Sequence, residues 1–161
     1  IIGRGDLYVE LQEEIEEKGL KNCVHLLGAM PPEEVRKYME EARIFLFTSD
    51  QNEGWGAVLN ESMNSGCAVV ANQSIGAVPW LIRQGKNGFI YSDGDWDELY
   101  KYTRCLLEDK TIAQNMGKAA YQTIVTEWNA ENAAARLLEW YADKQCGCET
   151  EKSWKGILEK E

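Results

Sequence analysis

The sequence predicts an α/β fold in which a parallel sheet is flanked by helices. Short apolar runs, as expected of strands buried on both faces, alternate with stretches of about ten residues whose apolar positions recur at helical spacing. Strands that alternate with helices in this way form parallel sheets with helices on both faces. The 161 residues, of which 44% are hydrophobic, suffice for one domain with one core. We expect that domain to span 1–144, followed by a helical C-terminal extension over 145–161.

Five apolar runs are the predicted strands. The chain opens on Ile1-Ile2-Gly3, which resembles the end of a strand, and CVHLLG is a short apolar run that ends at Gly28. IFLF and CAVVA are continuous apolar runs, and NGFIYS follows a turn. The predicted strands therefore cover residues 1–3, 23–28, 44–47, 67–71 and 87–92.

Helices are predicted between and after these strands. The first has Leu7, Leu11 and Ile15 at helical spacing and ends at Gly19, and the second has Pro32 in its first turn. A third ends at Gly66, and Pro79 opens a short fourth one. The predicted helices cover residues 6–18, 31–42, 55–64, 78–84, 95–108, 110–127 and 129–143, with a weaker amphipathic stretch over 149–160.

The net charge of −10 argues against a protein that binds nucleic acid or an anionic membrane with its whole surface. A small anionic ligand is still compatible with it, because helix N-termini bind phosphate without side-chain cations. No apolar run is long enough to span a membrane, and the N-terminus lacks the pattern of a signal peptide. The chain begins without Met and in mid-pattern, from which we expect a fragment of a longer protein.

The cysteines, the single histidine and most tryptophans are expected to be structural. The five cysteines are scattered and odd in number, which indicates reduced thiols in a cytoplasmic protein, with Cys23 and Cys67 in the core. Cys146 and Cys148 have no partner pair, so we expect no zinc site. His25 is expected in the core or at an edge. Packing roles are also expected for four tryptophans, namely Trp96, Trp128, Trp140 and Trp154.

The predicted ligand site lies at the carboxyl ends of the strands, where parallel sheets bind their ligands. The loops there include NEGWGAVLNES, with Glu53 and Glu61 eight positions apart, beside Gly54 and Gly56. Glycines let the backbone approach a ligand closely, and two carboxylates can each accept hydrogen bonds from one hydroxyl-rich ligand. The alternative is that Glu53 caps the helix and Glu61 is a solvated helix residue.

The string FTSDQNEGWGAVLNESMNSGCAVVAN resembles the motif region of the retaining glycosyltransferases of family 4, which have the GT-B architecture. That family has Glu-x7-Glu with an aromatic residue between two glycines after the first glutamate, and then a small-residue turn and an apolar strand. The segments IIGRGDLYVEL, VHLLGAMPPEEVRKYMEEARIFLFTS and IGAVPWLIRQGKNGFIYSDGD also resemble the family in order and spacing. The resemblance implies a Rossmann-like domain, the C-terminal half of a GT-B fold that lacks its first strand and helix.

The resemblance also implies site residues. Glu53 would contact the donor sugar as the catalytic residue, and Glu61 would bind the ribose hydroxyls. The remaining residues implied to bind the donor are Gly54, Trp55, Gly56, Gly28, Ala29, Met30, Gly76 and Arg4. Trp80 stands where the family commonly has a glutamate, so the contacts of that glutamate are not carried over.

The function implied is transfer of a sugar from a UDP- or GDP-linked donor to an acceptor glycan or lipid, without cofactor or metal. The acceptor would bind through an absent N-terminal domain, which could also hold the cytoplasmic protein at a membrane. We expect no nucleic acid partner, and the fragment alone should be inactive and could dimerise through unpaired strand edges. The alternative is a non-catalytic Rossmann-like nucleotide-binding or interaction module. A dinucleotide oxidoreductase is disfavoured, because Gly3-Arg4-Gly5 lacks a third glycine.

Overall fold

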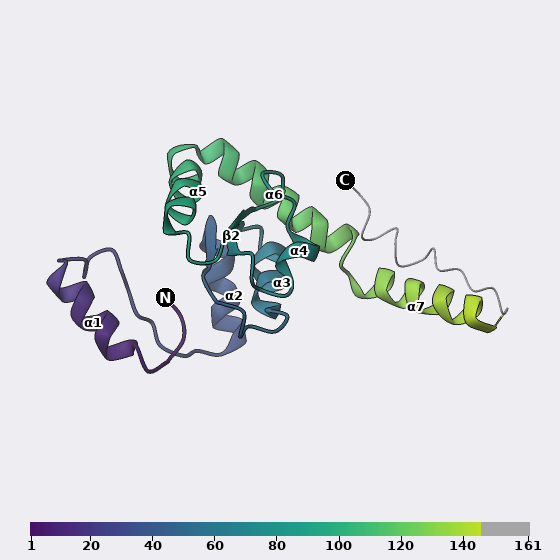
Figure 1. Cartoon of the computed structure of the whole chain (residues 1–161), viewed down its shortest axis with the longest axis horizontal. Helices are drawn as coiled ribbons and strands as arrows, with labels where there is room; N and C mark the ends of the chain where they lie inside the picture. The colour runs from purple at the N-terminus through teal and green to yellow at the C-terminus, as the bar shows by residue number, and fades with distance from the viewer. Residues whose placement is uncertain (146–161) are drawn as a thin grey trace.

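The computed structural model describes residues 1–145 and confirms an α/β fold in which a parallel sheet is flanked by helices. Figure 1 shows α1 at one end of the long axis of the molecule and α7 at the other, with the sheet between them. The elements in chain order are α1 (Tyr8–Glu17), α2 (Pro32–Glu41), β1 (Ile44–Phe47), α3 (Ala57–Asn64), β2 (Ala68–Asn72), α4 (Val78–Leu81), β3 (Phe89–Tyr91), α5 (Trp96–Glu108), α6 (Lys110–Thr126) and α7 (Ala130–Gln145).

The sheet within the described residues has three parallel strands in the order β1-β2-β3. Ile44 is paired with Ala68, and Val70 with Phe89. All five residues of the central strand β2 are buried, as expected of a strand with neighbours on both edges and helices on both faces. β1 is an edge strand, because it pairs only with β2.

Alternate residues of β2 face two separate cores, because successive side chains of a strand point to opposite faces. Val69 and Ala71 pack with residues of α3, α4 and the second half of α6, including Leu59 and Ile124. Ala68 and Val70 pack on the other face with Leu106 of α5 and with the first half of α6. α6 thus crosses from one face to the other, and its Gly117 allows this, since a Cβ there would lie 2.1 Å from the Gly66 carbonyl oxygen.

Buried polar side chains fix the loops that follow the strands. Asn87, which is 2% exposed, donates to the Leu81 carbonyl and to Thr123 Oγ1 and accepts from the Arg83 N–H. Asn72, at the end of β2, donates to Asp93 at 2.6 Å and accepts from Ser74. These bonds compensate the desolvation of the amides and give the loops after β2 and α4 one geometry.

The prediction of strands at residues 1–3 and 23–28 is wrong. These segments form one isolated parallel bridge, between Ile2 and Gly28, instead of two strands. Without a third strand beside it a short two-stranded ladder has too little stability of its own. The prediction that Cys23 lies in the core is also wrong: Cys23 is exposed, because its segment contributes no strand to the sheet.

Most other predicted elements lie within about two residues of the observed ones, which is the usual uncertainty of helix ends. The helix predicted at 78–84 is shorter, ending at Leu81, and α7 extends to Gln145. The C-terminal extension predicted at 145–161 and its helical stretch at 149–160 lie outside the described residues, apart from Gln145 itself. No helix among the described residues has the length and apolar character needed to cross a membrane.

Candidate functional site

The loop between β1 and α3 carries the predicted acidic motif. The Asn52 backbone N–H donates to Asp50 Oδ1 at 2.8 Å, and the Glu53 N–H donates to the Asp50 carbonyl oxygen at 3.0 Å. An aspartate that bonds to the backbone two residues ahead stabilises a tight turn. The turn leaves Glu53 half-buried, and its carboxylate forms no hydrogen bond or ion pair with any described residue. The carboxylate is therefore free to accept hydrogen bonds from a ligand.

The loop after β2 lies directly against this motif. The Gly76 N–H donates to the Gly54 carbonyl oxygen at 3.1 Å, and the Ala77 N–H donates to the Trp55 carbonyl oxygen at 2.9 Å. A Cβ on Gly76 would lie 2.2 Å from the Gly54 carbonyl oxygen, far inside van der Waals contact. Glycine is required at position 76, and the structure brings these predicted site residues together.

α3 begins immediately after the motif, with Gly56 in the left-handed conformation at φ 78°. A side chain at Gly56 would meet Phe47 and Ile75 at 2.9 Å. The backbone N–H groups of Gly54, Trp55 and Gly56 donate no hydrogen bond to any described residue. These free donors lie at the positive end of the α3 dipole, so an anionic or hydroxyl-rich ligand is favoured there.

Glu61 lies in the second turn of α3 and lines a groove of about 480 Å³ between α2 and α3. Arg36 and Lys37 line its α2 side, and neither forms an ion pair with a described residue. The sequence alone does not indicate these two cations as site residues, because only the packing of α2 beside α3 places them in one groove with Glu61. The groove residues are Pro32, Glu33, Arg36, Lys37, Met39, Glu40, Glu61, Asn64 and Ser65.

Arg4 and Gly28 lie together in the N-terminal segment. The Gly3 N–H donates to the Gly28 carbonyl oxygen at 2.8 Å, and Arg4 Nε lies 3.8 Å from the place of a Cβ on Gly28. Arg4 is exposed and has no partner among the described residues. Ala29 and Met30 follow directly and lead into α2. The structure thus places an unpaired cation beside Gly28, Ala29 and Met30, which the resemblance implies bind the donor.

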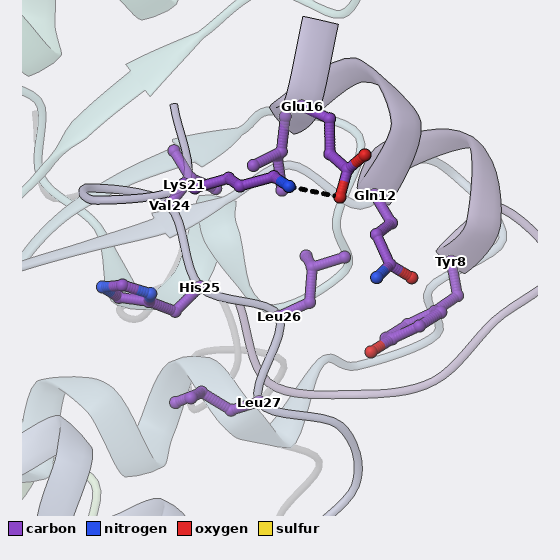
Figure 2. Close-up of a pocket in the computed structure, with 9 residues that line it drawn as sticks. Tyr8, Gln12, Glu16, Lys21, Val24, His25, Leu26 and Leu27 are labelled. Atoms are coloured by element: carbon purple, nitrogen blue, oxygen red, sulfur yellow. Dashed lines mark ion pairs between the residues drawn. The ribbon is translucent and has the colours of Figure 1, made fainter. Parts of the chain in front are cut away.

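A second groove, between α1 and residues 24–27, contains none of the predicted site residues. Figure 2 shows Tyr8 and Gln12 reaching from α1 toward Leu26, whereas His25 points away from α1. Glu16 and Lys21 form an ion pair of 2.6 Å at the rim. His25 is exposed, so it is not a core residue, and because residues 23–28 form no strand it does not lie at a strand edge either.

Among residues 1–145, no three histidine, cysteine or acidic side chains are grouped as a metal site would require. Cys67 is buried, and burial raises the pKa of its thiol to about 11. It is therefore protonated at neutral pH and is not a nucleophile. Its Sγ–H donates to the Met39 carbonyl oxygen at 3.1 Å, which joins α2 to the start of β2.

Residues 1–123 match the family model described as glycosyl transferases group 1. Over 144 residues the chain is 33% identical to an amylovoran biosynthesis glycosyltransferase of Erwinia amylovora, covering 86% of this chain and 35% of that protein. It is 31% identical over 119 residues to a sulfoquinovosyl transferase of Arabidopsis thaliana, covering 71% of this chain and 23% of that protein. The chain thus spans about a third or less of the length of these relatives.

Solved structures give the same fold. Anabaena HepE in complex with UDP superposes with a TM-score of 0.75 and 26% identity, over 88% of this chain and 40% of that one. The C-terminal domain of a glycosyl transferase group 1 family protein from Francisella tularensis superposes with a TM-score of 0.71 and 23% identity. That match covers 78% of this chain and 64% of that one.

Proposed function

The chain belongs to the group 1 glycosyl transferases, and from this membership we propose that it binds the donor in a retaining glycosyltransferase of family 4. The donor is a nucleotide diphosphate-sugar, linked to UDP or GDP, and a hexose is transferred to an acceptor glycan or lipid. The acceptor binds to a separate N-terminal domain. The reaction takes place in the cytoplasm and requires neither metal nor another cofactor.

The observation that carries the proposal is the loop before α3. Within four consecutive residues it contains the unpaired Glu53 carboxylate and the backbone N–H groups of residues 54–56, none of which donates to a described residue. When a glycosidic bond to a diphosphate breaks, negative charge grows on the departing phosphate oxygens. Preorganised amide donors at a helix N-terminus stabilise that charge without reorganising during the reaction. Glu53 accepts hydrogen bonds from sugar hydroxyls and thereby orients the sugar over these donors.

Glu61 and the N-terminal segment hold the nucleoside. The exposed Glu61 carboxylate has two oxygens with which to accept hydrogen bonds from the two ribose hydroxyls. The backbone of Gly28, Ala29 and Met30 contacts the base, and Arg4 reaches the diphosphate. UDP as the carrier is supported by the Anabaena protein, which was solved with UDP.

The test compares the steady-state kinetics of two variants, each made in the protein expressed from its complete gene. Glu53→Gln should lower kcat by about 10- to 100-fold, because it weakens a charged hydrogen bond to the reacting sugar. Glu61→Ala should instead raise the KM for the nucleotide sugar by a similar factor, because the ribose is remote from the bond that breaks. Glu10→Gln, on the exposed face of α1, is the matched control.

Two results would oppose the proposal. Wild-type kcat in Glu53→Gln would remove the catalytic role of Glu53. Binding of UDP or GDP without any sugar transfer by the wild-type protein would favour a non-catalytic nucleotide-binding module.

A further inference from the structure

The side chain of Trp55 is held by two contacts, one with Asn60 and one with Trp128. Its indole N–H donates to Asn60 Oδ1 at 2.9 Å. Its ring packs on Trp128, with ring centroids 5.7 Å apart and ring planes inclined at 41°. Both contacts fix the orientation of the indole, and through it the peptide groups on either side of Trp55.

Trp128 belongs to the corner between α6 and α7, which is held in place by its own hydrogen bonds. The backbone N–H of Trp128 donates to the carbonyl oxygens of Thr123 and Ile124. Glu127 forms an ion pair of 2.6 Å with Arg83. Asn129 Nδ2 donates to the Val125 carbonyl oxygen at 2.8 Å, and Asn129 Oδ1 accepts from the Asn132 N–H.

The Trp128 ring is also seated on the main core. It is half-buried and packs against the cluster that contains Phe47, Leu59 and Ile75. Phe47 and Ile75 are the residues that flank Gly56. Trp128 is therefore attached to the core and to the end of α6 independently of its contact with Trp55.

The motif loop has few other attachments. Gly76 and Ala77 donate to the carbonyl oxygens of Gly54 and Trp55, and these bonds hold one side of the loop. The side chain of Trp55 holds the other side, through Asn60 and Trp128. The amide N–H groups between these anchors are the proposed donors to the diphosphate, so their direction depends on both anchors.

We propose that Trp128 is a positioning residue for sugar transfer, which rests on the proposed function of the loop. Its ring fixes Trp55 and so aims the backbone amides of Gly54 to Gly56 at the departing diphosphate. Trp128 touches neither donor nor acceptor, and it lies 73 positions after Trp55 in the chain. It acts in the transition state, where these amides meet their largest charge.

The kinetic test is a double-mutant cycle in the gene-encoded protein, with UDP-glucose and GDP-mannose as donor probes. Trp128→Ala should lower kcat by about 10-fold, the scale of one lost aromatic contact, and change the donor KM by less than about threefold. In the Trp55→Ala background the same change should lower kcat by less than about twofold, because the contact is already absent. Trp128→Phe should restore most of kcat. Trp96→Ala, at a 67% exposed position of α5, is the control.

A second measurement does not depend on sugar transfer. The Gly76 and Ala77 amides, which are bonded to the loop, should exchange hydrogen at least about 10-fold faster in Trp128→Ala and remain protected in Trp96→Ala. If the wild-type protein transfers no sugar, the proposed function fails and exchange alone decides the role of Trp128. If the Gly76 and Ala77 amides exchange in Trp128→Ala at the wild-type rate, the positioning role is overturned. It is also overturned if Trp128→Ala lowers kcat by the same factor in the wild-type and the Trp55→Ala backgrounds. If Trp128→Ala does not fold, the cycle and the exchange measurement are made with Trp128→Leu, which keeps an apolar side chain against the core but removes the ring that packs on Trp55, and a loss of the same pattern is expected.

Discussion

Replacing Gly76 with alanine probes the contact between the two loops that form the candidate site. The added Cβ would lie 2.2 Å from the Gly54 carbonyl oxygen and 3.2 Å from the Gly54 carbonyl carbon. Both are backbone atoms, so no side-chain rotation relieves the clash. The loops must separate by about 1 Å to reach ordinary contact, and overpacking of this kind costs about 1–3 kcal/mol.

That separation also breaks the two backbone hydrogen bonds between the loops, from Gly76 to Gly54 and from Ala77 to Trp55. Each contributes about 1 kcal/mol. Since part of the strain is relieved when the bonds break, we expect the free energy of unfolding to fall by about 2–4 kcal/mol. Urea denaturation followed by circular dichroism measures this change as a lower midpoint at an unchanged slope.

The matched control is Gly54→Ala, in the same pair of loops. No atom lies within 4 Å of a Cβ at Gly54, and its φ is outside the left-handed region. Its free energy of unfolding should stay within about 1 kcal/mol of wild type. If Gly76→Ala is as stable as Gly54→Ala, the close approach of the two loops is refuted.

Two further predictions concern a thiol and the sheet edge. Because burial raises the pKa of Cys67 to about 11, iodoacetamide at pH 8 should alkylate the exposed Cys23 and leave Cys67 unmodified until urea unfolds the chain; peptide mass spectrometry identifies the modified residue. The raised pKa also makes stability depend on pH. The contribution of the buried, protonated thiol to the free energy of unfolding is fully present below pH 9.0, the ordinary pKa of a thiol, and is lost as the pH rises from 9 toward 11. Among residues 1–145 one edge of β1 has no partner strand, so we expect the 161-residue chain to self-associate. Light scattering would detect this as a mass that rises with concentration, and a mass of 18.3 kDa at every concentration would contradict it.

The central strands and most helices could be predicted because each has a strong local pattern. Cys67 to Ala71 is a continuous apolar run whose five residues are all buried, and Gly19 and Gly66 follow α1 and α3. Residues 23–28 have a similar apolar composition but form no strand. The difference is the sheet to which the run belongs: β1, β2 and β3 form one three-stranded sheet, whereas residues 2 and 28 are joined only to each other, by one bridge. Composition predicts the tendency to form a strand, and neighbours that are distant in sequence decide whether the strand forms.

The same limit applies to the candidate site. The loop containing Glu53 and Gly54 was predicted from its own residues and from its place after a buried strand. Its contacts with Gly76 and Trp128 join segments more than 20 and 70 positions away, and no periodicity encodes such pairs. Trp128 was correctly expected to pack and not to serve as a sugar platform. The same expectation was wrong for Trp96, which is 67% exposed, and Trp154 lies outside the described residues.

The two halves of the proposed donor site differ in how firmly they are held, and this difference has a consequence for binding. Gly54, Gly76 and α3 are attached to a core in which Leu59 and Ile75 are fully buried. The half with Arg4 and Gly28 belongs to the N-terminal segment. No residue of α1 is buried, and the two ends of this segment are joined by the single bridge between residues 2 and 28. Local stability follows buried contacts, so the N-terminal half opens at a lower free energy than the core half. Amides that stabilise a transition state must be fixed beforehand, whereas a base-binding loop can be ordered by its ligand at the cost of affinity. The rigid half of the site is therefore the one to which catalysis is assigned, and the weakly packed half is the one in which base recognition would be completed on binding.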